Sequence, residues 1–227
     1  ISFYKKHNIE APPNQFNYDI QTYQISLDLK EKLTAKVMVE LKNVHSEAIT
    51  FSLYHKYPLE KIVDQNGSNV LFRQDGDFVT VNRKNNHQSE KFTFYYTLRN
   101  SYMFPVSNNY LYLPNYLNWI PKKSDNETFS YYKYVGVEDS IKSNSNQSTD
   151  LIEYSLDIKD NLKELTLKTN LSEAKGNSYQ GEVSGGITVT AGEITIETIN
   201  GDKIVHPNSW SNLSDDWVAY KDVLERV

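Results

Sequence analysis

Apolar and polar residues alternate along most of the chain. The longest alternating runs place apolar residues at Tyr23, Ile25, Leu27 and Leu29, at Ala35, Val37, Val39 and Leu41, and at Phe92, Phe94, Tyr96 and Leu98. Alternation with a period of two predicts strands that bury one face. Shorter runs of this kind start at Ile49, Ile62, Val70, Phe78, Tyr131, Ile152, Leu165, Ile187, Ile194 and Ile204. Ten or more short strands predict an all-β chain, and we expect an antiparallel β-sandwich.

Turn signals separate these runs. Asn66-Gly67 and Asp75-Gly76 are strong two-residue hairpin signals, and Asn200-Gly201-Asp202 precedes the run at Ile204. Ala191-Gly192 is expected to turn the run at Ile187 directly into the run at Ile194. Residues 140–150 are polar and turn-rich, which predicts a surface loop.

One stretch interrupts the alternation. Residues 110–121 read Tyr-Leu-Tyr-Leu-Pro-Asn-Tyr-Leu-Asn-Trp-Ile-Pro and are called the aromatic crossing below. Pro114 and Pro121 each remove a backbone donor and push the preceding residue toward extended geometry, so this stretch cannot be a helix or a regular central strand. We expect an ordered, largely buried segment that joins the two halves of the chain.

The pattern divides the chain into three segments. Residues 1–17 contain Pro12-Pro13 and predict an extended lead-in or tether, and residues 18–210 form the predicted sandwich. In residues 211–227, Ser214 can cap a helix whose apolar residues recur at spacings of three and four. We expect a short C-terminal helix there that begins a following domain.

Composition argues against several classes of protein. The formal net charge is -5 and the chain lacks a cluster of Lys and Arg, which argues against nucleic acid as a partner. The absence of Cys excludes disulfides and thiolate sites, but it suits an exported bacterial protein as well as a cytosolic one. No apolar run approaches the roughly 20 residues that cross a bilayer, so we expect no transmembrane segment in this chain.

The sequence contains no recognisable catalytic signature. Its histidines stand alone, without a second His or a Glu at ligand spacing: His7, His45, His55, His87 and His206. The H-E-x-x-H zinc motif, the nucleophile elbow and the phosphate-binding loop are all missing. Asp75-Gly76-Asp77 offers oxygen ligands for Ca²⁺, but a plain hairpin turn is favoured. We therefore expect no catalytic, metal-binding or cofactor-binding residue, no cofactor and no enzyme activity in this chain.

The aromatic crossing provides the candidate binding surface. Tyr110, Tyr112, Tyr116 and Trp119 have the side chains that stack against sugars and peptides. The same side chains would also suit a plug between two sheets, or a contact with a neighbouring domain. The plug is favoured, and the binding or interdomain surface stays open.

The order of these features resembles the N-terminal domain of the M1 (gluzincin) aminopeptidase family. The stretches that carry the resemblance are Tyr23-Gln24-Ile25-Ser26-Leu27-Asp28-Leu29, Val37-Met38-Val39-Glu40-Leu41-Lys42-Asn43, Ile49-Thr50-Phe51-Ser52-Leu53, Tyr116-Leu117-Asn118-Trp119-Ile120-Pro121 and Leu165-Thr166-Leu167-Lys168-Thr169-Asn170. The resemblance spans roughly residues 18–210. It implies a saddle-like β-sandwich that precedes a thermolysin-like zinc domain, so any zinc site would lie beyond Val227.

The aromatic crossing departs from active members of that family. They carry Arg, an aromatic-Pro-Cys run and acidic partners at this point, whereas this chain has Trp119-Ile120-Pro121-Lys122-Lys123. The residue that helps to hold a substrate's amino terminus would fall near Leu113-Pro114, which cannot do so. The degenerate stretch is similar to the M1-like extracytoplasmic parts of certain bacterial ABC-type permeases. The lack of an initiator Met also fits a segment of a longer, membrane-tethered extracytoplasmic protein.

Two functional hypotheses follow. In the first, the chain is a non-catalytic M1-like domain that supports or shapes an adjacent domain of its parent, with a peptide or protein as a further partner. In the second, it is a free-standing binding or adhesion module that recognises glycan or protein through its Tyr-rich surface.

Overall fold

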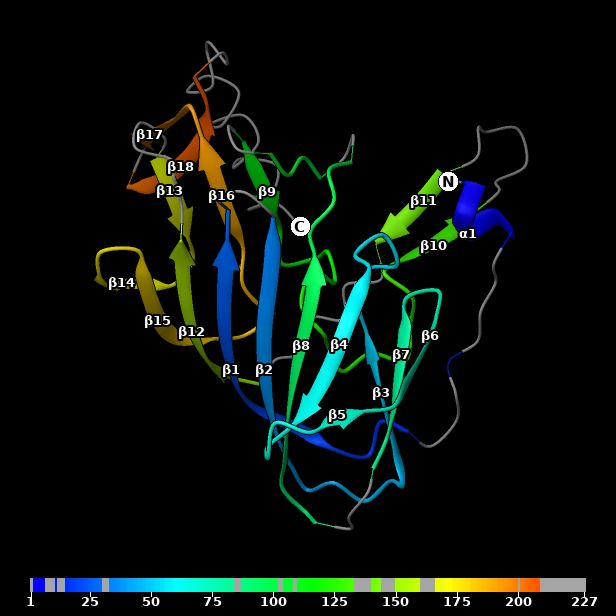
Figure 1. The fold of residues 1–227 in the computed structure, drawn as a ribbon. Coiled ribbons are helices and arrows are strands. Elements are labelled where there is room, and N and C mark those ends of the chain that lie inside the picture. Colours follow the sequence, from blue (N-terminus) through cyan, green and yellow to red (C-terminus); the bar gives the residue numbers. More distant parts are fainter. Residues whose placement is uncertain are drawn as a thin grey trace.

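The computed structural model of the chain describes residues 2–6, 11, 15–29, 33–83, 87–101, 104–107, 110–132, 140–143, 150–159, 166–199 and 201–208. Nearly all of its regular structure is β, which confirms the predicted all-β class (Figure 1). The predicted C-terminal helix in residues 211–227 lies outside the described residues.

An eight-stranded sheet forms the larger layer (Figure 1). In spatial order its strands are β14 (Ser172–Lys175), β15 (Ser178–Val183), β12 (Ile152–Lys159), β1 (Asp19–Asp28), β2 (Thr34–Lys42), β8 (Glu90–Thr97), β4 (Leu59–Asp64) and β5 (Asn69–Val70). In β2 and β8 buried residues alternate with more exposed ones, as the period-two pattern predicts. One face of this sheet therefore belongs to the core.

The remaining strands form four smaller sheets within the described residues. They are β3 (Ala48–Ser52), β7 (Phe78–Asn82) and β6 (Phe72–Asp75); β13 (Thr166–Thr169), β16 (Val189–Gly192) and β9 (Leu111–Leu113); β10 (Phe129–Tyr132) and β11 (Ser140–Ser143); and β17 (Ile194–Ile199) and β18 (Asp202–Pro207). Phe51 of β3 meets Phe94 of β8 edge to face, with ring centroids 5.0 Å apart. Both are fully buried, so the two layers share one core, as in a sandwich.

Sequence signals predict the contacts between neighbouring strands well. The turns at Asn66-Gly67, at Asp75-Gly76 and at Gly201 each join an antiparallel pair. Strands β1 and β12, however, pair in parallel, with Thr22 opposite Glu153. The chain forms several sheets between these two strands, and no local turn signal can set such a long-range direction.

Three expectations about local structure were wrong. Residues of the expected lead-in form a helical turn, α1 (Ser2–Lys6), in which Tyr4 is buried. Within the expected loop at 140–150, Ser140–Ser143 is strand β11, which pairs with β10. Ala191-Gly192 does not turn a hairpin, because β16 pairs with β13 and β9 whereas β17 pairs with β18. In each case tertiary partners supply hydrogen bonds or burial that the local sequence does not reveal.

The aromatic crossing is ordered and largely buried, as predicted. Residues 111–113 form the short strand β9 at one end of its sheet, and Leu117, Trp119 and Ile120 are fully buried. Tyr96 of β8 and Tyr23 of β1 donate hydroxyl hydrogen bonds to the carbonyls of Trp119 and Pro121, at 2.6 and 2.7 Å. These bonds fix the crossing against the core face of the eight-stranded sheet.

Candidate functional site

A groove of about 540 Å³ contains the first two predicted site residues, Tyr110 and Tyr112. Its floor is the sheet of β13, β16 and β9. Tyr112, Thr190 and Lys168 are register partners across this sheet, and because side chains of paired residues share a face, they form one row. The groove thus combines an aromatic, a hydroxyl and a cationic side chain at its base.

The hairpin of β17 and β18 supplies an apolar wall. Ile194 and Val205 line the groove, and Val205 is 40% exposed. His206 also lines it, and its Nε2 lies 3.4 Å from Oε1 of Glu197. A volume of this size lies within the range of small-ligand pockets, and mixed apolar and polar walls are typical of them.

The remaining predicted site residues are placed differently. The Tyr116 hydroxyl lies 3.4 Å from that of Tyr112, and burial, followed by this contact, raises the pKa of Tyr112. Trp119 is fully buried, and its Nε1 donates to the carbonyl of Ile187 at 3.1 Å. The structure therefore brings together the three tyrosines, whereas Trp119 is part of the core. The binding role of the surface stays a prediction.

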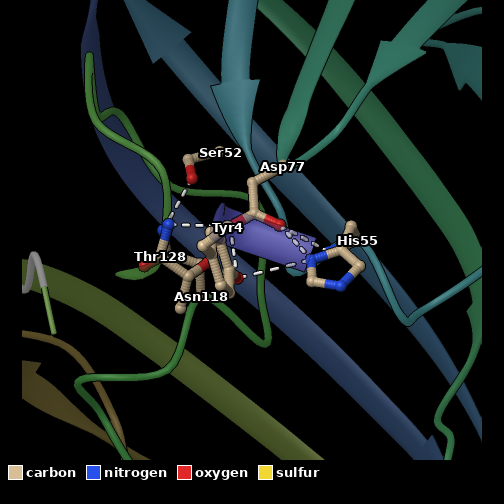
Figure 2. A network of polar contacts seen from close by, with 6 residues as sticks. All are labelled: Tyr4, Ser52, His55, Asp77, Asn118 and Thr128. Atoms are coloured by element: carbon tan, nitrogen blue, oxygen red, sulfur yellow. Dashed lines mark hydrogen bonds and ion pairs between the residues drawn. The ribbon is translucent and has the colours of Figure 1, made fainter. Parts of the chain in front are cut away.

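A second site, which the sequence analysis missed, is centred on Asp77, and this residue is fully buried. Figure 2 shows its carboxylate between side chains from distant parts of the chain. Oδ1 accepts the backbone N–H of His55 at 2.8 Å and lies 2.8 Å from His55 Nδ1. Oδ2 accepts the Tyr4 hydroxyl at 3.0 Å and the backbone N–H of Thr128 at 2.7 Å. Charge-assisted hydrogen bonds from four donors make this buried carboxylate a structural hub.

The hub joins α1 to the sandwich. The ring of Phe3 stacks on His55 with centroids 3.6 Å apart, and burial, followed by the charge of Asp77, raises the pKa of Tyr4. Beside the hub, Asn118 of the aromatic crossing donates to Ser52 Oγ of β3 at 2.6 Å (Figure 2). A hairpin signal at Asp75-Gly76 predicts only a turn, so no local pattern indicates that the Asp77 side chain points inward.

Glu127 lies next to this hub. Burial, and secondarily the charges of Asp77 and Asp75, raises the pKa of Glu127 to about 7.

Among the described residues no group of three or more His, Asp or Glu side chains has the geometry to hold a metal ion. Both oxygens of Asp77 accept hydrogen bonds from the protein, in keeping with the favoured hairpin reading of Asp75-Gly76-Asp77.

A smaller cavity of about 90 Å³ contains Lys122, which the sequence marked only as a departure from the M1 pattern. Its Nζ donates to the backbone carbonyl of Asn115, and burial lowers the pKa of Lys122 to about 8. The local sequence could not predict that this lysine is buried, because strands β1 and β12, which are distant in sequence, form its environment.

Comparison with known proteins identifies the fold. No protein-family model and no curated protein sequence matches the chain. Among solved structures, leukotriene A4 hydrolase from Saccharomyces cerevisiae superposes with a TM-score of 0.56 and 11% identity, over 90% of this chain and 34% of that one. An M1 zinc metallopeptidase from Deinococcus radiodurans gives 0.51 and 7%, over 89% and 50%. The fold is M1-like.

The M1-like fold extends over almost the whole chain, but the chain spans only about a third to a half of the matched proteins. Sequence identity near 10% establishes the shared fold and leaves the activity undecided. A search of the described residues for a helix long and apolar enough to cross a membrane finds none.

Proposed function

We propose that this chain is a non-catalytic domain of an M1 metallopeptidase-like protein, and that it supports or shapes an adjacent domain. The observation that carries the proposal is the extent of the fold match. About nine-tenths of this chain superposes on the N-terminal region of proteins whose remaining half to two-thirds it does not cover. A domain of this kind acts through the surface that it offers to its neighbour.

The groove beside Tyr112 is the surface proposed for that contact. Strand β18 forms part of its wall, and Asn208 at the end of β18 is held by a hydrogen bond from its backbone N–H to the carbonyl of Glu193. Asn208, the last residue that the structure describes, therefore lies beside this wall. Val205 leaves an apolar side chain exposed in the same wall, and exposed apolar surface favours an interdomain contact.

The wider setting is also part of the proposal. The departures of the aromatic crossing from the active M1 pattern support a parent that is tethered outside a bacterial membrane, as in M1-like parts of ABC-type permeases. Its partners are then the adjacent domain of the parent and a peptide or protein. Protease treatment of intact cells tests this location: extracellular protease should degrade the domain without lysis, and full protection would contradict it.

The test of the main proposal begins with the parent gene, read for about two hundred codons past Val227, the size of one domain. The encoded neighbour is produced separately and titrated with residues 1–227. We expect binding that Tyr112→Ala weakens about 30-fold, because an aromatic anchor contributes about 2 kcal/mol. Tyr95→Ala, which alters a half-buried tyrosine on the eight-stranded sheet, is the matched control. Absence of a neighbouring domain, or equal binding by both variants, would contradict the proposal.

A free-standing binding module is the second candidate, and the Tyr-lined groove is the observation that favours it. In this case the groove holds a glycan or a protein segment, stacked on Tyr110 or Tyr112. Glycan and peptide arrays probed with the wild-type chain and Tyr112→Ala distinguish the two candidates. Two results together would support the module: an array ligand whose binding requires Tyr112, and a parent gene that encodes no M1-like domain after this chain.

A further inference from the structure

The cavity next to Lys122 lies where the parallel strands β1 and β12 begin. Ile20 and Tyr23 of β1 and Ile152 and Tyr154 of β12 line one side of it. The rings of Tyr23 and Tyr154 stack with centroids 5.0 Å apart, and Tyr23 is held in place by its bond to the Pro121 carbonyl. This side of the cavity is a rigid surface made largely of carbon.

Charged and backbone groups line the other side. They belong to Lys122, Lys123, Asp19, Asp150 and the Gly185-Gly186 turn. Lys122 Nζ lies next to Gly186, since a Cβ built there would be 3.5 Å from it. The lysine residue retains some exposed surface, but its amine end is enclosed, and the burial that lowers its pKa to about 8 acts there. The cavity is therefore amphipathic, with a cation at one end.

The charge of Lys122 is not balanced by a carboxylate within the described part of the chain. Two carboxylates, Asp19 and Asp150, also line the cavity, but neither forms an ion pair with Lys122. Asp19 accepts a hydrogen bond from Asn43 Nδ2 at 2.8 Å and pairs with Lys123 Nζ at 3.3 Å. Lys122 Nζ instead donates to a neutral carbonyl, which uses one of its three N–H donors. A buried ammonium that lacks an anion costs free energy, and an anion in the cavity would offset that cost.

We propose that this cavity binds a small carboxylate, whose oxygens accept hydrogen bonds from Lys122 Nζ while its carbon chain lies against Tyr23 and Ile152. The volume of about 90 Å³ is several times the space that one water requires, so it admits a group of a few heavy atoms. A short-chain carboxylate fits both the cationic end and the apolar wall. The site is separate from the groove and does not depend on the proposed interdomain role.

Butyrate is the probe, and butyramide, which has the same shape without the charge, is its control. Binding is measured by calorimetry, and the rate of acetylation of Lys122 and Lys175 by an activated ester is followed by peptide mass spectrometry. We expect saturable binding of butyrate that slows the acetylation of Lys122 and leaves the acetylation of Lys175, which lies on the exposed strand β14, unchanged. Butyramide should do neither.

Two variants separate this site from a purely structural lysine. Lys122→Met keeps the stem and removes the cation, and it should lower the affinity for butyrate about tenfold or more, the value of a charge-assisted hydrogen bond. Ile152→Trp fills the cavity with Lys122 intact and should also abolish binding, whereas Lys175→Met, on the exposed strand β14 away from the cavity, should retain it. Binding that persists in Lys122→Met or Ile152→Trp, or no protection of Lys122 in the wild-type chain, would overturn the proposal. If Lys122→Met fails to fold, the result with Ile152→Trp decides.

Discussion

The ring of Tyr110 lies directly against the α-carbon of Gly192. A Cβ built on Gly192 would be 2.5 Å from Cδ2 and 3.0 Å from Cε2 of that ring. Real Cβ atoms do not approach so closely, so only glycine allows this position of the first tyrosine of the groove. The contact links the end of β16 to the start of the aromatic crossing.

Gly192→Ala should therefore displace Tyr110 and destabilise the chain by about 1–3 kcal/mol, the usual cost of overpacking. Urea unfolding measures the cost. Gly181→Ala is the control, because its Cβ would meet Leu171 Cδ2 at an ordinary 3.7 Å. In a Tyr110→Ala background the cost of Gly192→Ala should shrink; an undiminished cost would assign the effect to the backbone of Gly192 instead of the ring.

Asp77→Asn should lower the free energy of unfolding by about 2–4 kcal/mol. An amide of the same shape cannot accept hydrogen bonds at both ends, so donors of Thr128, His55 or Tyr4 lose their partner. Asp75→Asn is the matched control, because its pair with Arg73 is exposed and contributes about 0–1 kcal/mol. Hydrogen exchange should also show faster opening of Ser2–Lys6 in Asp77→Asn. Equal stability of Asp77→Asn and Asp75→Asn would contradict the role of Asp77 as a structural hub.

Glu127 should make stability depend on pH between 4.5 and 7. Its pKa is raised from 4.5 to about 7, so the folded state holds this proton more tightly than the unfolded chain. The resulting stability is complete below pH 4.5 and is lost as the pH rises through about 7. The free energy of unfolding in urea should therefore be higher at pH 5 than at pH 7, and Glu127→Gln should reduce this difference by about 2 kcal/mol. Glu173→Gln on the exposed strand β14 should leave that difference unchanged.

Trp119→Phe should lower the free energy of unfolding by about 2–4 kcal/mol. The substitution leaves the Ile187 carbonyl without its N–H donor and opens a cavity in the shared core. Tyr95→Phe, on the outer side of β8, should stay within about 0.5 kcal/mol of wild type. One net hydrogen bond contributes about 1 kcal/mol. A smaller loss for Trp119→Phe would mean that the indole does not hold the two layers together.

Short-range patterns predicted much of this fold. Alternation of apolar residues indicated β1, β2 and β8, because a strand that buries one face needs a period of two. Asn66-Gly67, Asp75-Gly76 and Asn200-Gly201 indicated their turns, because glycine tolerates the positive φ that the structure shows at all three. Pro114 and Pro121 indicated an irregular crossing, since each fixes φ and lacks an N–H donor.

By itself, then, the sequence determined the all-β class, the neighbouring hairpins and the buried crossing, since each depends on residues a few positions apart. The tertiary structure alone decided the parallel pairing of β1 with β12, the inward turn of Asp77 toward His55 and Tyr4, and the enclosure of Lys122. These features depend on desolvation and on hydrogen bonds between segments up to about 130 residues apart, and a local pattern cannot encode which distant groups will meet.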